Sequence, residues 1–199
     1  MAMEINIKLR IPTWVERILI QPALFYRRVR YGYTFRRIPL TQRQYAIVDC
    51  DDYERLTKWK WYALKSRRTY YAARNEWQRT AVKKRKCKMI MMHNEVLRPA
   101  EGMLADHRND NGLDNRKANL REATQEENAR NRRKARTKSG SIYKGVWYLK
   151  RDGRWAARIR VDGCAKHIGV YDDEAAAAKA YDRAAREYYK EFARLNFPD

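Results

Sequence analysis

The chain has 199 residues, among them 45 Lys or Arg and 24 Asp or Glu, which gives a formal net charge of +21 at pH 7. A charge of this size opposes compaction unless a polyanion neutralises it, so nucleic acid is the leading partner. No apolar run approaches the roughly 18 residues of a membrane span, and residues 1–20 lack a signal-peptide core, so no membrane role is expected. The three cysteines lie far apart without a CxxC pair, which argues against a disulfide framework or zinc ribbon and indicates a reducing compartment.

Residues 1–40 carry no pattern that predicts a particular element. Their aromatic side chains fit core or docking roles better than base stacking: Trp14, Phe25, Tyr26 and Tyr31. Beyond them, short β-like runs alternate with turns. Strands are predicted at 45–49, 59–64, 69–74 and 88–92, with a helical turn over 51–57. This stretch is therefore expected to be a small mixed α+β segment.

Residues 93–131 form an acidic, Asn-rich island in a basic chain, with 6 basic and 8 acidic side chains. Carboxylates weaken a phosphate-binding surface unless they hold a cation that meets the phosphate, so the island is where chemistry is expected. A strand is predicted to end at Asp106-His107, a polar loop to follow, and a return strand to begin at Asn119. Thr124 and Glu127 then fit a capping box at the start of a helix.

The adjacent Asp106 and His107 can divide two tasks of phosphodiester hydrolysis, because neighbouring side chains diverge at a strand end. The carboxylate would hold a metal ion, and the imidazole would take the proton of the attacking water. Asn128, in the first turns of the predicted helix, adds an oxygen donor of the type that suits Mg²⁺. For the Asp-His pair alone, a structural hydrogen bond is the commoner explanation, and Asn-rich loops are commonly plain turns.

The whole constellation resembles the HNH (ββα-metal, His-Me finger) endonucleases, in the form found in phage and mobile-intron homing enzymes. The resemblance covers residues 92–131 and rests on Asp106-His107, Leu113-Asp114-Asn115, Ala118-Asn119-Leu120-Arg121 and Glu127-Asn128-x-x-Asn131. It implies His107 as the general base and Asn119 as the residue that orients it. It also implies Asp106 and Asn128 as ligands of one divalent ion, Mg²⁺ with Mn²⁺ as the alternative. The family's last His is Asn128 here, which leaves the metal preference open, and His93 is expected to be structural.

Residues 132–140 (RRKARTKSG) are basic and polar, and they are predicted to be a linker. Two interpretations stay open, the solvated end of the preceding helix and a strap along the DNA backbone. Strand-like runs follow at 143–150, 154–161 and 164–170, separated by turns that contain Asp-Gly, a strong hairpin signal. A helix is then predicted over 172–190, with acidic residues at its start.

Alternation in the middle run predicts two different faces. One face, expected to pack on the helix, carries Trp155, Ala157, Ile159 and Val161, and the other carries Arg154, Ala156, Arg158 and Arg160. Arginine is the commonest reader of base edges in the major groove, so the second face is a candidate DNA-reading surface.

The C-terminal part resembles the AP2/ERF DNA-binding domain. The matching elements are Tyr143-Lys144-Gly145-Val146, residues 154–160, Ile168-Gly169, Glu174-Ala175-Ala176, Ala180-Tyr181-Asp182 and Leu195-Asn196-Phe197-Pro198. Members of that family insert the sheet face into the major groove. The resemblance therefore implies Lys144 on a phosphate and five side chains on the DNA face: Trp147, Arg154, Arg158, Arg160 and His167. Trp147 replaces a usual arginine and His167 a usual tryptophan, so the base preference of plant members is not transferred.

The predicted fold class is α+β, a ββα-metal HNH core followed by a three-stranded antiparallel sheet packed on one helix. The expected domains are 1–40 (unassigned), 41–131 (nuclease with its preceding segment), 132–140 (linker) and 141–199 (AP2/ERF-like). The predicted function is site-specific cleavage of double-stranded DNA by a monomer that needs no small-molecule cofactor. Its expected location is the cytoplasm of a bacterial or phage-infected cell. Two alternatives stay open, a DNA-binding regulator with an inactive HNH core and a structural RNA-binding protein.

Overall fold

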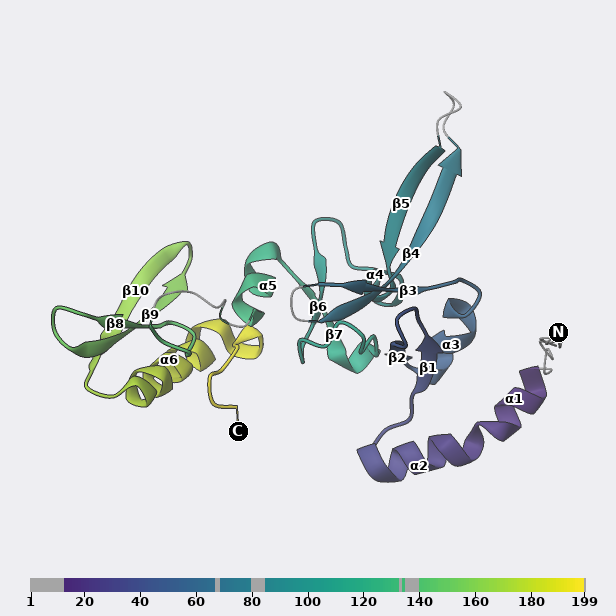
Figure 1. Cartoon of the computed structure of the whole chain (residues 1–199), viewed down its shortest axis with the longest axis horizontal. Coiled ribbons are helices and arrows are strands. Elements are labelled where there is room, and N and C mark those ends of the chain that lie inside the picture. Colours follow the sequence, from purple (N-terminus) through teal and green to yellow (C-terminus); the bar gives the residue numbers. More distant parts are fainter. Residues whose placement is uncertain (1–12, 67–68, 80–84, 133, 135–139, 199) are drawn as a thin grey trace, which may run out of the picture. The chain divides into compact units, whose positions relative to one another are not determined.

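The computed structural model describes residues 13–66, 69–79, 85–132, 134 and 140–198 (Figure 1). The chain divides into two compact units, residues 1–92 with 113–117 and residues 93–112 with 118–199. The range 41–131 contributes residues to both units, and its assignment as one nuclease domain stays a prediction. In the described part of the chain, no helix is both long enough and apolar enough to cross a membrane.

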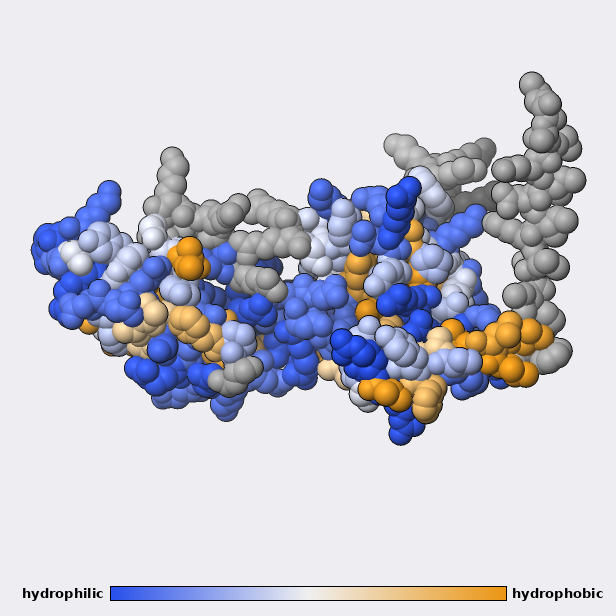
Figure 2. Space-filling view, turned by 60° about the horizontal axis from the view of Figure 1, so that its bottom comes forward, coloured by the Kyte–Doolittle hydropathy of each residue, from blue (hydrophilic) through white to orange (hydrophobic). Residues whose placement is uncertain are grey.

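The first unit begins with two helices, α1 (Thr13–Leu19) and α2 (Gln21–Tyr31), which no sequence pattern predicted. Apolar residues gather over both helices, in orange in Figure 2, and four of them are more than half exposed: Ile18, Leu19, Phe25 and Val29. Of the two roles expected for Phe25 and Tyr26, packing in the core is wrong, because 71% and 60% of their surfaces are exposed. The side chain of Trp14 lies outside the described residues.

Two small antiparallel sheets build the rest of the first unit. β1 (Arg36–Pro39) pairs with β2 (Tyr45–Val48), and α3 (Cys50–Leu56) follows. The second sheet has the order β3 (Tyr62–Lys65), β4 (Tyr70–Arg79), β5 (Arg85–Met91). The four strands and the helical turn predicted between residues 45 and 92 correspond to β2–β5 and α3.

A helix, a hairpin and a second helix open the second unit. α4 (Met92–Leu97) precedes β6 (Leu104–His107), which pairs antiparallel with β7 (Leu120–Ala123) after the 3-10 helix η1 (Lys117–Asn119). α5 (Gln125–Asn131) follows at once, and its N-terminus carries the predicted capping box between Thr124 and Glu127. The polar loop therefore leaves β6 at Asp106-His107 and returns next to it at β7.

The C-terminal part of the second unit is a three-stranded antiparallel sheet backed by one helix. The order is β10 (Cys164–Tyr171), β9 (Arg154–Val161), β8 (Val146–Leu149), and α6 (Glu174–Tyr189) covers one face before the 3-10 helix η2 (Lys190–Phe192). Gly145 is needed at the start of β8, because a Cβ there would lie 2.0 Å from Tyr181 Cδ2 and the backbone has a φ of +75°. The α+β class with small antiparallel sheets is confirmed.

Candidate nucleic-acid interface and the Asp106 hairpin

The face of β9 that points away from α6 carries its arginines, as the alternation predicted. Ile159 is only 2% exposed in the core beneath α6, whereas its neighbours Arg158 and Arg160 are exposed. In the antiparallel register Arg158 lies opposite His167, and Ala156 opposite Trp147. We call this surface the arginine face, and its members are Trp147, Arg154, Arg158, Arg160 and His167.

Arg158 lies at the centre of the arginine face and is held by an aromatic ring. Its guanidinium carbon is 4.8 Å from the centroid of the Trp147 ring, a cation–π contact. The Trp147 and His167 rings approach each other edge to face, with 6.5 Å between their centroids. Arg154 instead pairs with Asp172 at 2.7 Å in an exposed ion pair, a kind of contact that contributes little to stability. Arg158 is therefore the most preorganised of the predicted base-reading arginines.

Lys144 is placed differently from the other predicted DNA-binding residues. Its ammonium donates to the main-chain carbonyl of Arg132 at 2.8 Å and to that of Arg130, at the C-terminal end of α5. Burial, and then the charge of Arg194, lower the pKa of Lys144 to about 8. A phosphate contact would require this ammonium to leave its carbonyl partners, so its predicted role on DNA stays a prediction.

The lowered pKa makes the stability of the fold depend on pH. The ordinary pKa of the lysine is 10.5 and the folded value is about 8, so between these values the unfolded chain binds more protons. The free energy of unfolding should therefore rise with pH across this window, and Lys144→Met should remove that part of the rise. Urea unfolding of both proteins from pH 7.5 to 10.5 measures it, with the exposed Lys150→Met as control. Equal pH profiles for the Lys144 variant and wild type would contradict the prediction.

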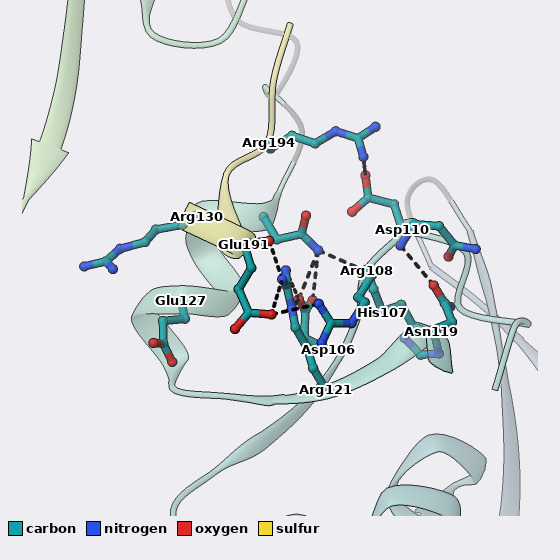
Figure 3. Close-up of polar contacts among 12 residues, drawn as sticks. Asp106, His107, Arg108, Asp110, Asn119, Arg121, Glu127, Arg130, Glu191 and Arg194 are labelled. Atoms are coloured by element: carbon teal, nitrogen blue, oxygen red, sulfur yellow. Dashed lines mark hydrogen bonds and ion pairs between the residues drawn. The ribbon is translucent and has the colours of Figure 1, made fainter. Parts of the chain in front are cut away.

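The ends of the β6–β7 hairpin bring three of the four predicted nuclease residues into one buried region. Asp106 and His107 are each 6% exposed, and Asn119 is 7% exposed. The Asn119 side-chain oxygen accepts a hydrogen bond from the main-chain N–H of Asn109 at 3.2 Å, which shapes the loop that follows His107 (Figure 3). Asn119 thus orders the chain around His107.

His93 packs edge to face against His107, with 5.0 Å between the ring centroids. Burial, and then the charge of His107, lower the pKa of His93 to about 3. His93 is therefore neutral at physiological pH, which suits the structural role expected for it.

Asp106 forms a buried, multiply bonded ion pair. Its Oδ2 accepts from Arg121 Nε at 2.9 Å and Nη2 at 2.8 Å, and from Asn131 Nδ2 at 3.0 Å. Asn131 Nδ2 also lies 3.0 Å from the carbonyl oxygen of His107, so it holds the strand end against α5. Asn131 had no role assigned from the sequence, although it belongs to the same Glu-Asn-x-x-Asn element as Asn128.

The donor atoms around Asp106 fit a hard divalent cation only in part. Asp106 Oδ1 accepts one hydrogen bond, from Asn131 at 3.2 Å, and so has capacity for a further ligand, whereas Oδ2 is committed to Arg121 and Asn131. Asn128 is half-buried on α5, and in the described residues no hydrogen bond joins it to Asp106. In the same residues no group of three or more His, Cys, Asp or Glu side chains is arranged to hold a metal. A cation here would rely on Asp106 and Asn128 and compete with Arg121.

The end of the C-terminal module packs on the hairpin through Arg121 (Figure 3). Arg121, 6% exposed, lies over the Phe192 ring with 3.9 Å from its guanidinium carbon to the centroid and donates to the main-chain carbonyl of Glu191. The Glu191 carboxylate pairs with Arg108 at 2.8 Å, and Arg194 pairs with Asp110 at 3.0 Å. The segment Lys190–Arg194 therefore completes the environment of Asp106.

Comparison with known proteins finds no family model that matches the chain. Over 68 residues it is 43% identical to the AP2-like ethylene-responsive transcription factor TOE2 of Arabidopsis thaliana, covering 34% of this chain and 14% of that protein. It is also similar to APETALA2-like protein 2 of Oryza sativa subsp. indica, 42% identical over 66 residues, covering 33% and 15% respectively. The chain thus spans about a seventh of the length of these relatives.

These similarities support the AP2-like DNA-binding module that the sequence predicted. The comparisons give no support to the HNH resemblance of residues 92–131, which stays a prediction. The expected location in the cytoplasm of a bacterial or phage-infected cell is wrong, because the relatives found are plant proteins, two of them named as transcription factors.

Proposed function

We propose that this protein binds double-stranded DNA at specific sequences and reads bases with the arginine face. The observation that carries the proposal is the exposed, ring-held Arg158 beside Arg160, on a module similar to AP2-like transcription factors. A guanidinium can donate two parallel hydrogen bonds to the O6 and N7 atoms of guanine, which no other base pair offers in that pattern. The packing of α6 on the opposite face leaves the arginine face available for the major groove.

Arg158→Ala and Arg160→Ala should each reduce the binding free energy that discriminates between bases at one position by about 1–3 kcal/mol, because one bidentate contact is lost. Selection of binding sites from a random duplex pool, done with wild type and each variant at two salt concentrations, measures this effect. Arg151→Ala is the matched control, since Arg151 lies in the turn between β8 and β9 and its side chain is 92% exposed. Uniform weakening on all sequences, without relaxed preference at any position, would show that these arginines only contact the backbone.

A second candidate function is hydrolysis of the bound DNA at the hairpin. It is favoured by the burial of Asp106 and His107 side by side at the end of β6, with Asn131 of α5 bonded to both residues. In this proposal His107 takes the proton of the attacking water and Asn119 orders the loop beside it. Asp106 and Asn128 would hold a divalent ion, which when bound supplies charge stabilisation to the phosphate.

One assay separates the two candidates. Supercoiled plasmid DNA is incubated with the full chain and Mg²⁺, and in parallel a gel-shift assay follows binding to the selected site. Binding accompanied by metal-dependent nicking supports both functions. Site-specific binding without nicking in either Mg²⁺ or Mn²⁺ would leave the DNA-binding regulator as the function.

A further inference from the structure

The segment from residue 17 to residue 48 carries charge of one sign only. It contains seven arginines and no acidic residue. In the first unit this segment forms the last three residues of α1, all of α2, and the hairpin of β1 and β2. Five of its arginines are exposed: Arg17, Arg28, Arg30, Arg37 and Arg43. The roles proposed for the arginine face and the β6–β7 hairpin do not involve these arginines, so they do not explain this concentration of positive charge.

Two of these arginines converge on one buried ring. Phe35 is 3% exposed, and the guanidinium carbons of Arg27 and Arg37 lie 4.6 Å and 5.8 Å from its centroid. Arg37 also lies over Tyr45, at 4.2 Å from the ring centroid, and Arg27 donates to the Phe35 carbonyl. We call Arg27, Phe35, Arg37 and Tyr45 the Phe35 cluster.

The Phe35 cluster holds positive charge that no carboxylate in the described chain balances. Its neighbour Arg36 pairs with Glu16, but neither Arg27 nor Arg37 makes an ion pair with any described residue. Burial, and then the charges of Arg37 and Arg36, lower the pKa of Arg27. Cations brought together in this way repel one another, and an anion bound between them would relieve the repulsion.

We propose that the Phe35 cluster binds backbone phosphates of duplex DNA, as a contact separate from the arginine face. A guanidinium that lies over a ring still has N–H groups for other partners. Arg27 uses Nη1 on the Phe35 carbonyl, and its remaining N–H groups and those of Arg37 match the oxygens of a phosphate. Tyr45, 42% exposed beside Arg37, presents a hydroxyl group of the kind that also contacts phosphates. The ligand is the DNA of the proposed function, and the contact carries no sequence preference.

The slope of log Kd against log salt concentration tests the inference, because each lost phosphate contact lowers it by about 0.9. The full chain is titrated with a random-sequence duplex, as wild type and as the double variant Arg27→Gln/Arg37→Gln. The control is the double variant Arg17→Gln/Arg43→Gln, which removes two positive charges from the same segment but leaves the Phe35 cluster intact. Arg17 forms an ion pair with Glu54 and does not belong to the cluster. We expect the slope to fall by about 2 for the cluster variant and by less than about 0.5 for the control.

Because Arg27 also bonds to the main chain, Arg37→Gln alone is the second variant, with an expected fall of about 0.9. Equal slopes for the cluster and control variants would overturn the inference, since net charge alone would then explain the binding. The inference would also be overturned if the cluster variant lost binding to phosphatidylserine vesicles while its salt-dependence slope for DNA stayed at the wild-type value. That result would assign the cluster to a membrane surface. The ratio of selected-site to random-duplex affinity reports the proposed function separately, because it depends on the arginine face.

Discussion

Asp106→Ala should lower the free energy of unfolding by about 3–5 kcal/mol, because it leaves the Arg121 guanidinium buried without its carboxylate. Both partners are nearly inaccessible, with side chains 7% and 6% exposed, so water cannot replace the lost bonds. The Glu191 carboxylate, 3.7 Å from Arg121 Nη1, offers partial compensation, which favours the lower end of the range. Urea unfolding at neutral pH gives the value.

The control for this loss is Asp172→Ala, which removes an ion pair of similar length at the surface. Its partners are 44% and 88% exposed, and the expected effect is below about 1 kcal/mol. If Asp106→Ala costs no more than Asp172→Ala, the buried pair with Arg121 does not stabilise the second unit. Asp106→Asn, which keeps the acceptor oxygen, should lie between the two.

His107→Ala should reduce metal-dependent nicking by about 10²–10⁴-fold while leaving DNA affinity nearly unchanged, because a general base acts on water. Single-turnover nicking at saturating protein measures the rate, and a gel shift measures binding. Asp106→Ala is less informative here, since it also removes the bonds that hold β6 and β7 together.

His167→Ala is the matched control, because it changes the same residue type on the arginine face. It should weaken binding and leave the single-turnover rate at saturation unchanged. A His107→Ala protein that nicks within a fewfold of wild type would exclude His107 from the mechanism. A wild type that does not nick would instead leave the hairpin as a structural element of a DNA-binding regulator.

The C-terminal module could be predicted from sequence because its signals are local. Alternation along β9 and the Asp-Gly turns place β9 and β10 within one residue, whereas β8 begins three residues later than the predicted run. The predicted helix start at Asp172 is one residue from the observed N-cap, Asp173. The capping box of Thr124 and Glu127 likewise spans three residues. Each of these features depends on side chains that are neighbours in the chain.

The contacts around Arg121 and Lys144 could not be predicted in this way. Arg121 reaches Asp106 across 15 residues and the Glu191 carbonyl across 70 residues, and a basic side chain alone does not indicate either partner. Lys144 is predicted from the sequence to contact a phosphate, but its ammonium donates hydrogen bonds to main-chain carbonyls at the end of α5. The helices α1 and α2 were not predicted, and four of their apolar side chains, Ile18, Leu19, Phe25 and Val29, are more than half exposed, so these residues do not form the buried stripe that is typical of an amphipathic helix.

The docking of Lys190–Arg194 on the hairpin limits how such proteins can be recombined. Glu191 and Phe192 follow the three-stranded sheet and α6 in sequence, yet they contact Arg108 and Arg121 of the hairpin. A chimera that joins residues 1–140 to a foreign reading module would discard both residues and leave Arg121 without its aromatic neighbour. A graft would keep the contacts with Arg108 and Arg121 if it retained the native segment from residue 190 onward, or if it carried an acidic and an aromatic residue at positions 191 and 192. Under the proposed function, DNA specificity would therefore be simpler to change by replacing side chains of the arginine face than by replacing the module.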